Sequence, residues 1–296
     1  MARQRCWQRD WVLDLDIESF FDRIDWELLM RAVRQHTDYK WALLYIERWL
    51  KAPMSMPDGT LVSRERGIPQ GSVISPVLAN LFLHYAFDCW MQREHPDIPF
   101  ERYADDAICR CRSEAQAQKL RRALEQRFAE CGLQLHTQKT KVIYCQDANR
   151  RDDCPERSFD FLGYTFRPRA SRNRDGVWFV SFLPAVSKQA AKRMRQRVRR
   201  WRLHLWNDLE LEQVAAWARP VLSGWVRYYG RFYPSKLRSE LRTIDQFIVR
   251  WAMRKYKRFR GRLMASWKWL HTVKRRHPQL FAHWSLEPAG RMMGAG

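Results

Sequence analysis

The tetrapeptide Tyr-Ala-Asp-Asp at residues 103–106 constrains the fold more than any other feature of this sequence. It lies between two short stretches, 100–105 and 107–112, which we expect to be strands joined by a tight turn. Adjacent aspartates at a turn raise each other's cost of ionisation unless a cation compensates them. Because carboxylate oxygens suit Mg²⁺, the pattern favours a metal site at this turn, with an ordinary solvated turn as the alternative.

A second group of carboxylates lies in and after the segment 11–17, which we expect to be a short, largely buried strand. Asp16 stands at the end of this strand, where a loop begins. Carboxylates from two strand ends could hold two metal ions that bind the attacking and leaving oxygens of a phosphoryl transfer. Asp14 shares strand parity with Asp16 and is a weaker candidate. For Asp22 and Asp25 a surface or helix-capping role is the better explanation.

A third feature is the segment 67–76, which contains two glycines and two prolines and runs into an expected helix start at Pro76. Such a segment predicts a rigid loop whose backbone can approach a ligand closely. An ordinary turn explains it equally well.

Local patterns elsewhere in residues 1–186 predict a mixed α+β region. The Pro-Asp-Gly turn at 57–59 indicates a hairpin tip. Ser113 and Gln116 predict an N-cap with a capping box, and Gly132 predicts the end of the same helix. The other expected helices cover 26–35, 41–51 and 76–92, and further strands cover 141–145, 159–166 and 177–183.

Taken in order, these segments resemble the motifs of reverse transcriptases. Residues 16–22 resemble motif A, residues 69–80 resemble motif B, and residues 103–106 resemble motif C. Residues 131–140 are similar to motif D, and residues 159–164 to the segment that closes the palm and grips the primer. The resemblance implies an RNA-directed DNA polymerase whose right-hand palm, an antiparallel sheet with packed helices, occupies residues 1–186.

The resemblance also implies roles for the matching residues. Two Mg²⁺ ions would be held by three carboxylates and a backbone carbonyl, those of Asp16, Asp105, Asp106 and Ile17. The incoming nucleotide would contact Phe21, Gln70, Gly71 and Tyr103. Phe21 would exclude a ribose 2′-hydroxyl and so select dNTPs, although Phe20 competes with it for the inward face. Lys139 would donate a proton to the leaving pyrophosphate; a plain surface lysine is the alternative.

The second half of the chain differs in charge. Residues 167–276 contain 29 basic and 6 acidic residues, whereas residues 1–166 contain 24 and 25. A compact domain with such an excess repels itself unless a polyanion offsets the charge, so the sequence predicts nucleic-acid binding. A merely solvated basic surface is the alternative. We expect an all-α region over 187–296, with helices at about 187–206, 211–230, 235–258 and 263–276.

Within this half, residues 220–257 resemble the maturase-specific domain, domain X, of group II intron proteins. The resemblance implies that the region binds group II intron RNA and helps it to splice. Most of the aromatic side chains here we expect to pack in a helical core. The basic residues expected to contact RNA phosphates are Arg195, Arg199, Arg200, Arg227, Arg254, Lys255 and Lys257.

One departure from the family pattern concerns the fingers, which normally precede motif A and contact the triphosphate and template. Only about ten residues precede the expected Asp16 strand. A separate fingers subunit or a homodimer could complete the polymerase, which would bind an RNA template, a DNA primer and dNTPs. The alternative is a non-catalytic RNA-binding splicing factor or a truncated remnant.

Cysteine usage and hydropathy bear on the setting of the protein. The seven cysteines are scattered without a CxxC pair, which argues against a zinc site or a disulfide framework. No apolar run reaches the length of a membrane span. We therefore expect a cytoplasmic protein with no membrane partner.

Overall fold

The computed structural model describes residues 6–150 and 154–286. The chain divides into two compact units: Met1–Phe159 with Pro168–Phe182, here called the sheet unit, and Asp160–Arg167 with Leu183–Gly296, here called the helical unit. The outer ends of the predicted regions, at residues 1 and 296, lie outside the described residues. The combination of antiparallel sheets and helices confirms the predicted α+β class.

The centre of the sheet unit is a four-stranded sheet of order β4-β5-β1-β6. Its strands are β1 (Trp11–Leu15), β4 (Phe100–Tyr103), β5 (Asp106–Cys111) and β6 (Lys141–Tyr144). β1 pairs antiparallel with both β5 and β6, which places Leu15 opposite Ala107. As a central strand it is shielded on both sides, and Val12 and Leu13 are fully buried. This pairing brings the end of β1 beside the start of β5.

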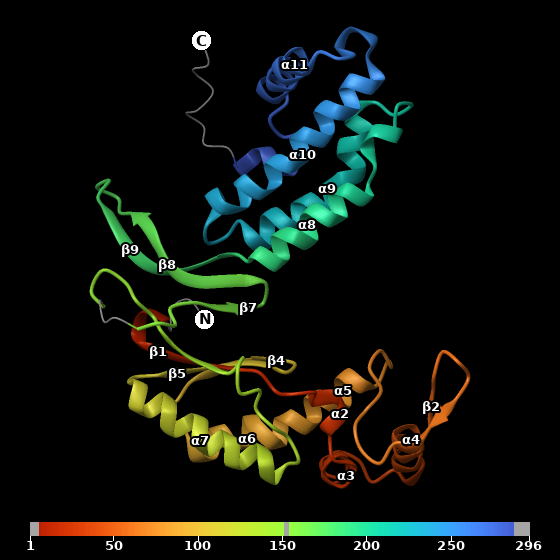
Figure 1. Ribbon diagram of the computed structural model, residues 1–296, viewed down its shortest axis with the longest axis vertical. Helices are drawn as coiled ribbons and strands as arrows, with labels where there is room; N and C mark the ends of the chain where they lie inside the picture. Colours follow the sequence, from red (N-terminus) through yellow and green to blue (C-terminus); the bar gives the residue numbers. More distant parts are fainter. Residues whose placement is uncertain (1–5, 151–153, 287–296) are drawn as a thin grey trace. The chain divides into compact units, whose positions relative to one another are not determined.

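Helices complete the sheet unit. They are α2 (Phe20–Arg23), α3 (Trp26–Arg34), α4 (Lys40–Lys51), α5 (Ser75–Leu83), α6 (Cys89–Glu94) and α7 (Glu114–Glu130). In Figure 1, α6 and α7 lie along one face of the sheet. Leu124 and Phe128 of α7 are buried in the same apolar core as Leu13 of β1. The strands β2 (Met54–Ser55) and β3 (Leu61–Val62) pair separately, so the predicted hairpin around residues 57–59 is confirmed.

The predicted helix over 76–92 is interrupted. Between α5 and α6 the chain forms a π-helical segment, η1 (His84–Asp88). A π segment disturbs the regular ladder of carbonyl acceptors. Here Arg127 of α7 donates to the carbonyl oxygens of Tyr85 (3.3 Å) and Ala86 (3.1 Å). A side chain from a distant helix therefore satisfies backbone groups in the interrupted turn.

The ends of α7 show which local predictions hold. Ser113 caps the helix by accepting a hydrogen bond from the N–H of Gln116 at 3.2 Å. The predicted capping box is wrong, however, because the Gln116 side chain accepts from the N–H of Arg112 (2.7 Å) instead of from Ser113. At the other end Gly132 has a φ of 72°. The N–H of Leu133 reaches back to the carbonyl of Phe128 at 2.8 Å, which is the Schellman termination that glycine favours.

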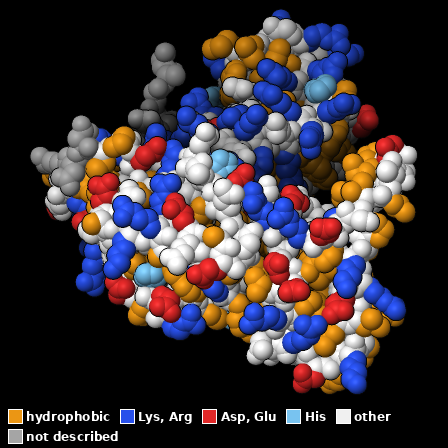
Figure 2. Space-filling model, turned by 60° about the horizontal axis from the view of Figure 1, so that its bottom comes forward, with side chains coloured by type: hydrophobic (Ala, Val, Ile, Leu, Met, Phe, Trp, Pro, Cys, Tyr) orange, Lys and Arg blue, Asp and Glu red, His pale blue; other side chains and the backbone are white. Residues whose placement is uncertain are grey.

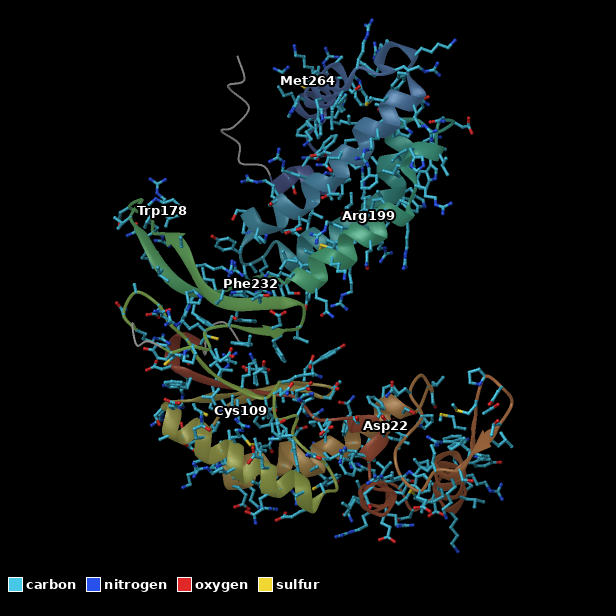
Figure 3. The ribbon with its side chains drawn as sticks, viewed as in Figure 1. Asp22, Cys109, Trp178, Arg199, Phe232 and Met264 are labelled. Carbon is cyan, nitrogen blue, oxygen red and sulfur yellow. The ribbon has the colours of Figure 1, made fainter. Side chains whose placement is uncertain are left out.

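The helical unit consists mainly of α8 (Lys188–Arg200), α9 (Leu211–Tyr229), α10 (Pro234–Lys255) and α11 (Leu263–Arg276). Short 3₁₀ segments lie between α8 and α9 (η2, Leu203–Leu205), between α10 and α11 (η3, Lys257–Phe259) and after α11 (η4, Ala282–Leu286). The four predicted helices are confirmed in number and order, but α8 ends at Arg200, before its predicted end near residue 206. A three-stranded sheet of order β7-β8-β9 precedes them in the chain, with β7 (Phe159–Phe161), β8 (Tyr164–Arg172) and β9 (Trp178–Val186). Trp178 lies at the far end of the β8–β9 hairpin (Figure 3).

A buried polar cluster joins three elements of the helical unit. Asp245 of α10 accepts hydrogen bonds from Lys274 of α11 (2.7 Å) and from the indole N–H of Trp284 in η4 (2.9 Å). His283 lies 3.1 Å from the same carboxylate. Burial by itself raises the pKa of Asp245, but the hydrogen bond and charge of His283 and the charge of Lys274 lower it to about 2. The carboxylate is therefore ionised and compensated by its partners.

None of the helices within residues 6–150 and 154–286 combines the length and the apolar character that crossing a bilayer requires.

Candidate active site

Asp16 follows β1 directly and is held by backbone pairing. Its carbonyl accepts from the N–H of His136 at 2.8 Å, and its N–H lies 3.3 Å from the hydroxyl of Thr140. The N–H of Glu18 donates to Gln134 (2.9 Å). Because backbone groups alternate sides along an extended chain, the carbonyl of Ile17 points away from residues 134–136, toward the side on which β5 pairs.

Asp105 lies in the turn between β4 and β5, and Asp106 is the first residue of β5. Tyr103 pairs with Asp106, so only Ala104 and Asp105 form the turn. Loss of hydration, together with the negative charges of Asp105 and then Asp16, raises the pKa of Asp106. The charge of Asp16 acts on Asp106, as expected for carboxylates at the adjoining ends of β1 and β5.

Lys139 contacts this region from the loop before β6. Its ammonium lies 3.1 Å from a carboxylate oxygen of Asp16, and 65% of its side chain is exposed. Lys139 is thus neither a remote surface lysine nor a buried one. The exposed ammonium thus forms an ion pair with the metal-ligand candidate Asp16.

The three aspartates offer the hard oxygen donors that Mg²⁺ prefers. Over the described ranges 6–150 and 154–286, no three His, Cys, Asp or Glu side chains converge closely enough to hold a metal ion. Burial, and then the charges of Asp105 and Asp16, raise the pKa of Asp106, and a bound cation would offset the cost of its ionised form. The donor set therefore fits Mg²⁺ in its chemistry, and closing it around an ion requires the carboxylates to approach each other further.

The glycine-rich loop is attached to the segment that follows Asp16. The N–H of Ile68 donates to the carbonyl of Phe21 at 2.8 Å. Gly67 has a φ of 79°, and a Cβ there would lie 2.8 Å from the backbone oxygen of Asp22, so both conformation and space require glycine.

Asp22, labelled in Figure 3, is exposed as predicted, and Asp25 caps α3 by accepting from the N–H of Leu28.

The nucleotide-binding candidates lie at or near the surface. Gln70 and Gly71 are exposed, and Gly71 has a φ of 88° with open space around its Cα. Tyr103 is 66% exposed. Phe20 is buried, whereas Phe21 is half-buried and packs edge-on against it. Phe20 therefore packs in the core, whereas Phe21 is partly exposed at the edge of the core, where it could contact a ligand.

Arg102, a residue that the sequence analysis did not single out, supports the turn. Its side chain is 12% exposed. It binds both carboxylate oxygens of Asp88, and it donates to the side chain of Asn80 (3.0 Å) and to the carbonyl of Ala104 (2.9 Å). An arginine inside a short strand, three residues before a pair of adjacent aspartates, was the sequence signal that could have identified it.

The predicted RNA-binding residues fall into two groups. Five are exposed on the helical unit, namely Arg199, Arg200, Arg227, Arg254 and Lys257. Arg199 on α8 is labelled in Figure 3. Arg195 is half-buried and forms an ion pair with Glu240. In the lower part of Figure 2, by contrast, acidic and basic side chains are interspersed, as the near balance of charge in residues 1–166 requires.

Lys255 has a different environment. Its side chain is 12% exposed, and its ammonium donates to the carbonyls of Asn207 and Leu209 and to the carboxylate of Glu210. An ammonium has three N–H donors, and all three have acceptors here. Lys255 therefore joins α10 to the start of α9, and we leave it out of the RNA-binding set that we propose below.

Comparison with known families agrees with this geometry. Residues 2–166 match the model of the reverse transcriptase (RNA-dependent DNA polymerase) family. The chain belongs to this family. Residues 191–269 match the maturase-specific domain of group II introns. The chain therefore combines a reverse transcriptase domain with a group II intron maturase-specific domain, as the motifs predicted.

Individual relatives are more distant. Protein YkfC of Escherichia coli (strain K12) is 26% identical to this reverse transcriptase over 198 residues, 55% of this chain and 48% of YkfC. The putative COX1/OXI3 intron 1 protein of Saccharomyces cerevisiae is 28% identical over 83 residues, 28% of this chain and 10% of that protein. The chain thus spans about half the length of YkfC and a smaller share of the yeast protein.

Among solved structures, the telomerase of Candida albicans in complex with the TWJ fragment of telomeric RNA matches 97% of this reverse transcriptase and 50% of the telomerase chain. The identity is 12% and the TM-score is 0.45. This likeness is too weak to establish the fold or the function of this chain.

Proposed function

We propose that this chain catalyses RNA-templated DNA synthesis and binds a group II intron RNA whose splicing it assists. The observation that carries the proposal is the position of three aspartates, Asp16, Asp105 and Asp106, at adjoining strand ends in a chain of the reverse transcriptase family. We further propose that the polymerase palm occupies residues 1–186 and the thumb and maturase region residues 187–296.

In this proposal the three aspartates and the carbonyl of Ile17 hold two Mg²⁺ ions. Ions bound there would lower the pKa of the primer 3′-hydroxyl and neutralise the triphosphate. Burial and the nearby charges of Asp105 and Asp16 raise the pKa of Asp106, and such cations would stabilise its ionised form. Lys139 would leave Asp16 for the substrate, where its ammonium could donate a proton to the leaving pyrophosphate.

The incoming dNTP lies over the loop at 67–71 in this proposal. Its contacts are with Phe21, Gln70, Gly71 and Tyr103, all of which retain exposed surface. The half-buried ring of Phe21 is backed by the buried ring of Phe20. A backed ring resists displacement, which suits it to exclude a ribose 2′-hydroxyl by contact.

The intron RNA is bound by the helical unit in this proposal. The excess of basic residues over 167–276 supplies the charge that phosphates require. The proposed contacts are the exposed residues Arg199, Arg200, Arg227, Arg254 and Lys257, together with Arg195, whose partner Glu240 would have to yield it.

The test is extension of a DNA primer on an RNA template with Mg²⁺ and dNTPs by the purified chain. The matched control is the double variant Asp105→Asn, Asp106→Asn, which keeps the shape of both side chains and removes their charge. We expect extension by the parent chain and none above background by the variant. RNA affinity of the two proteins, measured at one salt concentration, should be equal because the RNA-binding residues are unchanged.

Two other outcomes would change the conclusion. Extension that persists in the double variant would show that a contaminating polymerase or another site is responsible. No extension by either protein, with tight and specific binding of intron RNA by both, would favour the non-catalytic splicing factor. The excess of basic residues in the helical unit is the observation that favours this second function.

A further inference from the structure

The β4–β5 turn that carries Asp105 adopts a backbone conformation that alanine disfavours. Ala104 has a φ of 55°, in the left-handed region that costs an L-residue about 1–2 kcal/mol. The connection has two residues, since Tyr103 pairs with Asp106. Such conformations persist where the surrounding structure enforces them, and they concentrate at functional sites. Something must therefore hold this turn.

Arg102 supplies that support. Its Nη1 atom donates to the carbonyl of Ala104 at 2.9 Å. This carbonyl belongs to the peptide group that links Ala104 to Asp105, so the bond fixes the plane of that peptide. The orientation of the peptide decides the direction in which the Asp105 side chain leaves the backbone.

The guanidinium is itself held by two helical residues. The two carboxylate oxygens of Asp88 accept hydrogen bonds from Nε and Nη2 of Arg102, and the side-chain oxygen of Asn80 accepts one from Nη1 at 3.0 Å. A planar guanidinium bound on two edges has little freedom to rotate. Asp88 also neutralises the positive charge, so Arg102 adds little net field to the nearby aspartates.

Asp88 owes its position to the π-helical segment η1, of which it is the last residue. An extra residue in a helical turn rotates everything after it by about 100° relative to the preceding helix. Arg127 binds the carbonyls of Tyr85 and Ala86 within the same segment. Arg127 from α7 thus supports the segment that presents Asp88 to Arg102.

We propose that Arg102 is a positioning residue that sets the orientation of the Asp105 and Asp106 carboxylates for divalent cations. Asp88 and Asn80 hold Arg102, and Arg127 supports the π segment behind them. The inference rests on the proposed function, because it assumes that these carboxylates bind metal. A merely structural arginine would attach β4 to the helix and would leave cation binding unaffected once the chain is folded.

Lysine at position 102 separates the two roles. A lysine keeps the positive charge and can pair with Asp88, but its single ammonium cannot bind both Asp88 oxygens and the Ala104 carbonyl in the arginine geometry. The test measures Mn²⁺ affinity from the free-ion signal in electron paramagnetic resonance. It compares the full chain with Arg102→Lys, Arg102→Gln and Asp88→Asn at a temperature where circular dichroism shows each protein folded.

Loss of a residue that orients metal ligands weakens metal affinity or activity by about 10- to 100-fold, and we expect this loss of Mn²⁺ affinity in Arg102→Lys and Arg102→Gln. In primer extension, kcat should fall by a similar factor while KM for the primer–template stays constant. The matched control is Arg121→Lys, since Arg121 forms an ordinary ion pair with Glu125 on α7 (3.0 Å). Its Mn²⁺ affinity should remain within about twofold of the parent.

Each remaining outcome decides between the two proposals. Folded Arg102→Lys protein with parental Mn²⁺ affinity and kcat would overturn the positioning role and leave the proposed polymerase intact. If the parent chain binds Mn²⁺ no more tightly than the Asp105→Asn, Asp106→Asn variant does, both the positioning role and the proposed polymerase are overturned. If Arg102→Gln fails to fold, Arg102→Lys and Asp88→Asn decide the matter by the same measurement.

Discussion

Replacing Asp245 by asparagine removes a buried negative charge from the cluster that joins α10, α11 and η4. The carboxylate is 5% exposed and lies 2.7 Å from the ammonium of Lys274, which is itself 7% exposed. Asparagine has nearly the same shape and keeps an oxygen for the indole N–H of Trp284. The substitution therefore tests the charge more than the packing.

The structure sets the size of the effect. The pKa of Asp245 falls from 3.8 to about 2, and by linkage that fall corresponds to about 2.4 kcal/mol of stability at neutral pH. Removing one partner of a buried ion pair costs about 3–5 kcal/mol, since the other charge stays buried. We expect Asp245→Asn to lower the free energy of unfolding of the helical unit by about 3 kcal/mol.

The sign of the pH dependence follows from the direction of the pKa change. A carboxyl group whose pKa is lower in the folded protein stabilises the fold above its unfolded pKa of 3.8, and this stabilisation disappears as the pH falls through about 2. The parent should therefore lose stability between about pH 4 and pH 2. Asp245→Asn should lack this part of the pH dependence.

Urea unfolding followed by circular dichroism at 222 nm measures both quantities. The matched control is Asp208→Asn, a change of the same kind at an exposed carboxylate of the helical unit, which should alter stability by less than about 0.5 kcal/mol. A loss below about 1 kcal/mol in Asp245→Asn would refute the reasoning. It would mean that Lys274 and His283 find equivalent compensation without the carboxylate.

Three further predictions concern the candidate site and the RNA-binding surface. Gly67→Ala should destabilise the sheet unit by about 3 kcal/mol in thermal unfolding, because its Cβ would meet the Asp22 backbone in a left-handed conformation; a loss below about 1 kcal/mol would show that the loop adjusts freely. Asp106→Asn should raise the melting temperature slightly, with a gain in the free energy of unfolding below about 1 kcal/mol after solvent screening, because burial and the charges of Asp105 and Asp16 raise the pKa of Asp106 and disfavour its ionised form; a lower melting temperature would contradict this. The double variant Arg199→Ala, Arg200→Ala should bind RNA more weakly and reduce the slope of log affinity against log salt by about 1–2, and an unchanged slope would remove these residues from the RNA contact.

Much of the secondary structure could be predicted because its signals are local. Ser187 begins α8 by accepting a hydrogen bond from the N–H of Ala190 at 3.1 Å, and Pro234 opens α10. Both residues start a helix through contacts within its first turn. The same holds for the Ser113 cap of α7. The Gln116 side chain, by contrast, could accept from the N–H of Ser113 or of Arg112, and the structure shows that it accepts from Arg112.

The candidate site divides in the same way. The order of the motifs and the alternation along β1 determined that Asp16, Asp105 and Asp106 are the carboxylates to consider, since strand parity and turn position are readable from the chain. Which phenylalanine enters the core was decided by packing, with Phe20 buried and Phe21 at the margin.

Only the tertiary structure showed how the site is supported and which basic residues are already engaged. Arg102 meets Asp88, and Arg127 meets η1, through contacts between segments 14 and about 42 residues apart. Lys255 finds its acceptors at the start of α9. A sequence pattern records the propensity and polarity of each residue, but hydrogen-bond partners across the core depend on how helices and strands pack, and that packing decided these three roles.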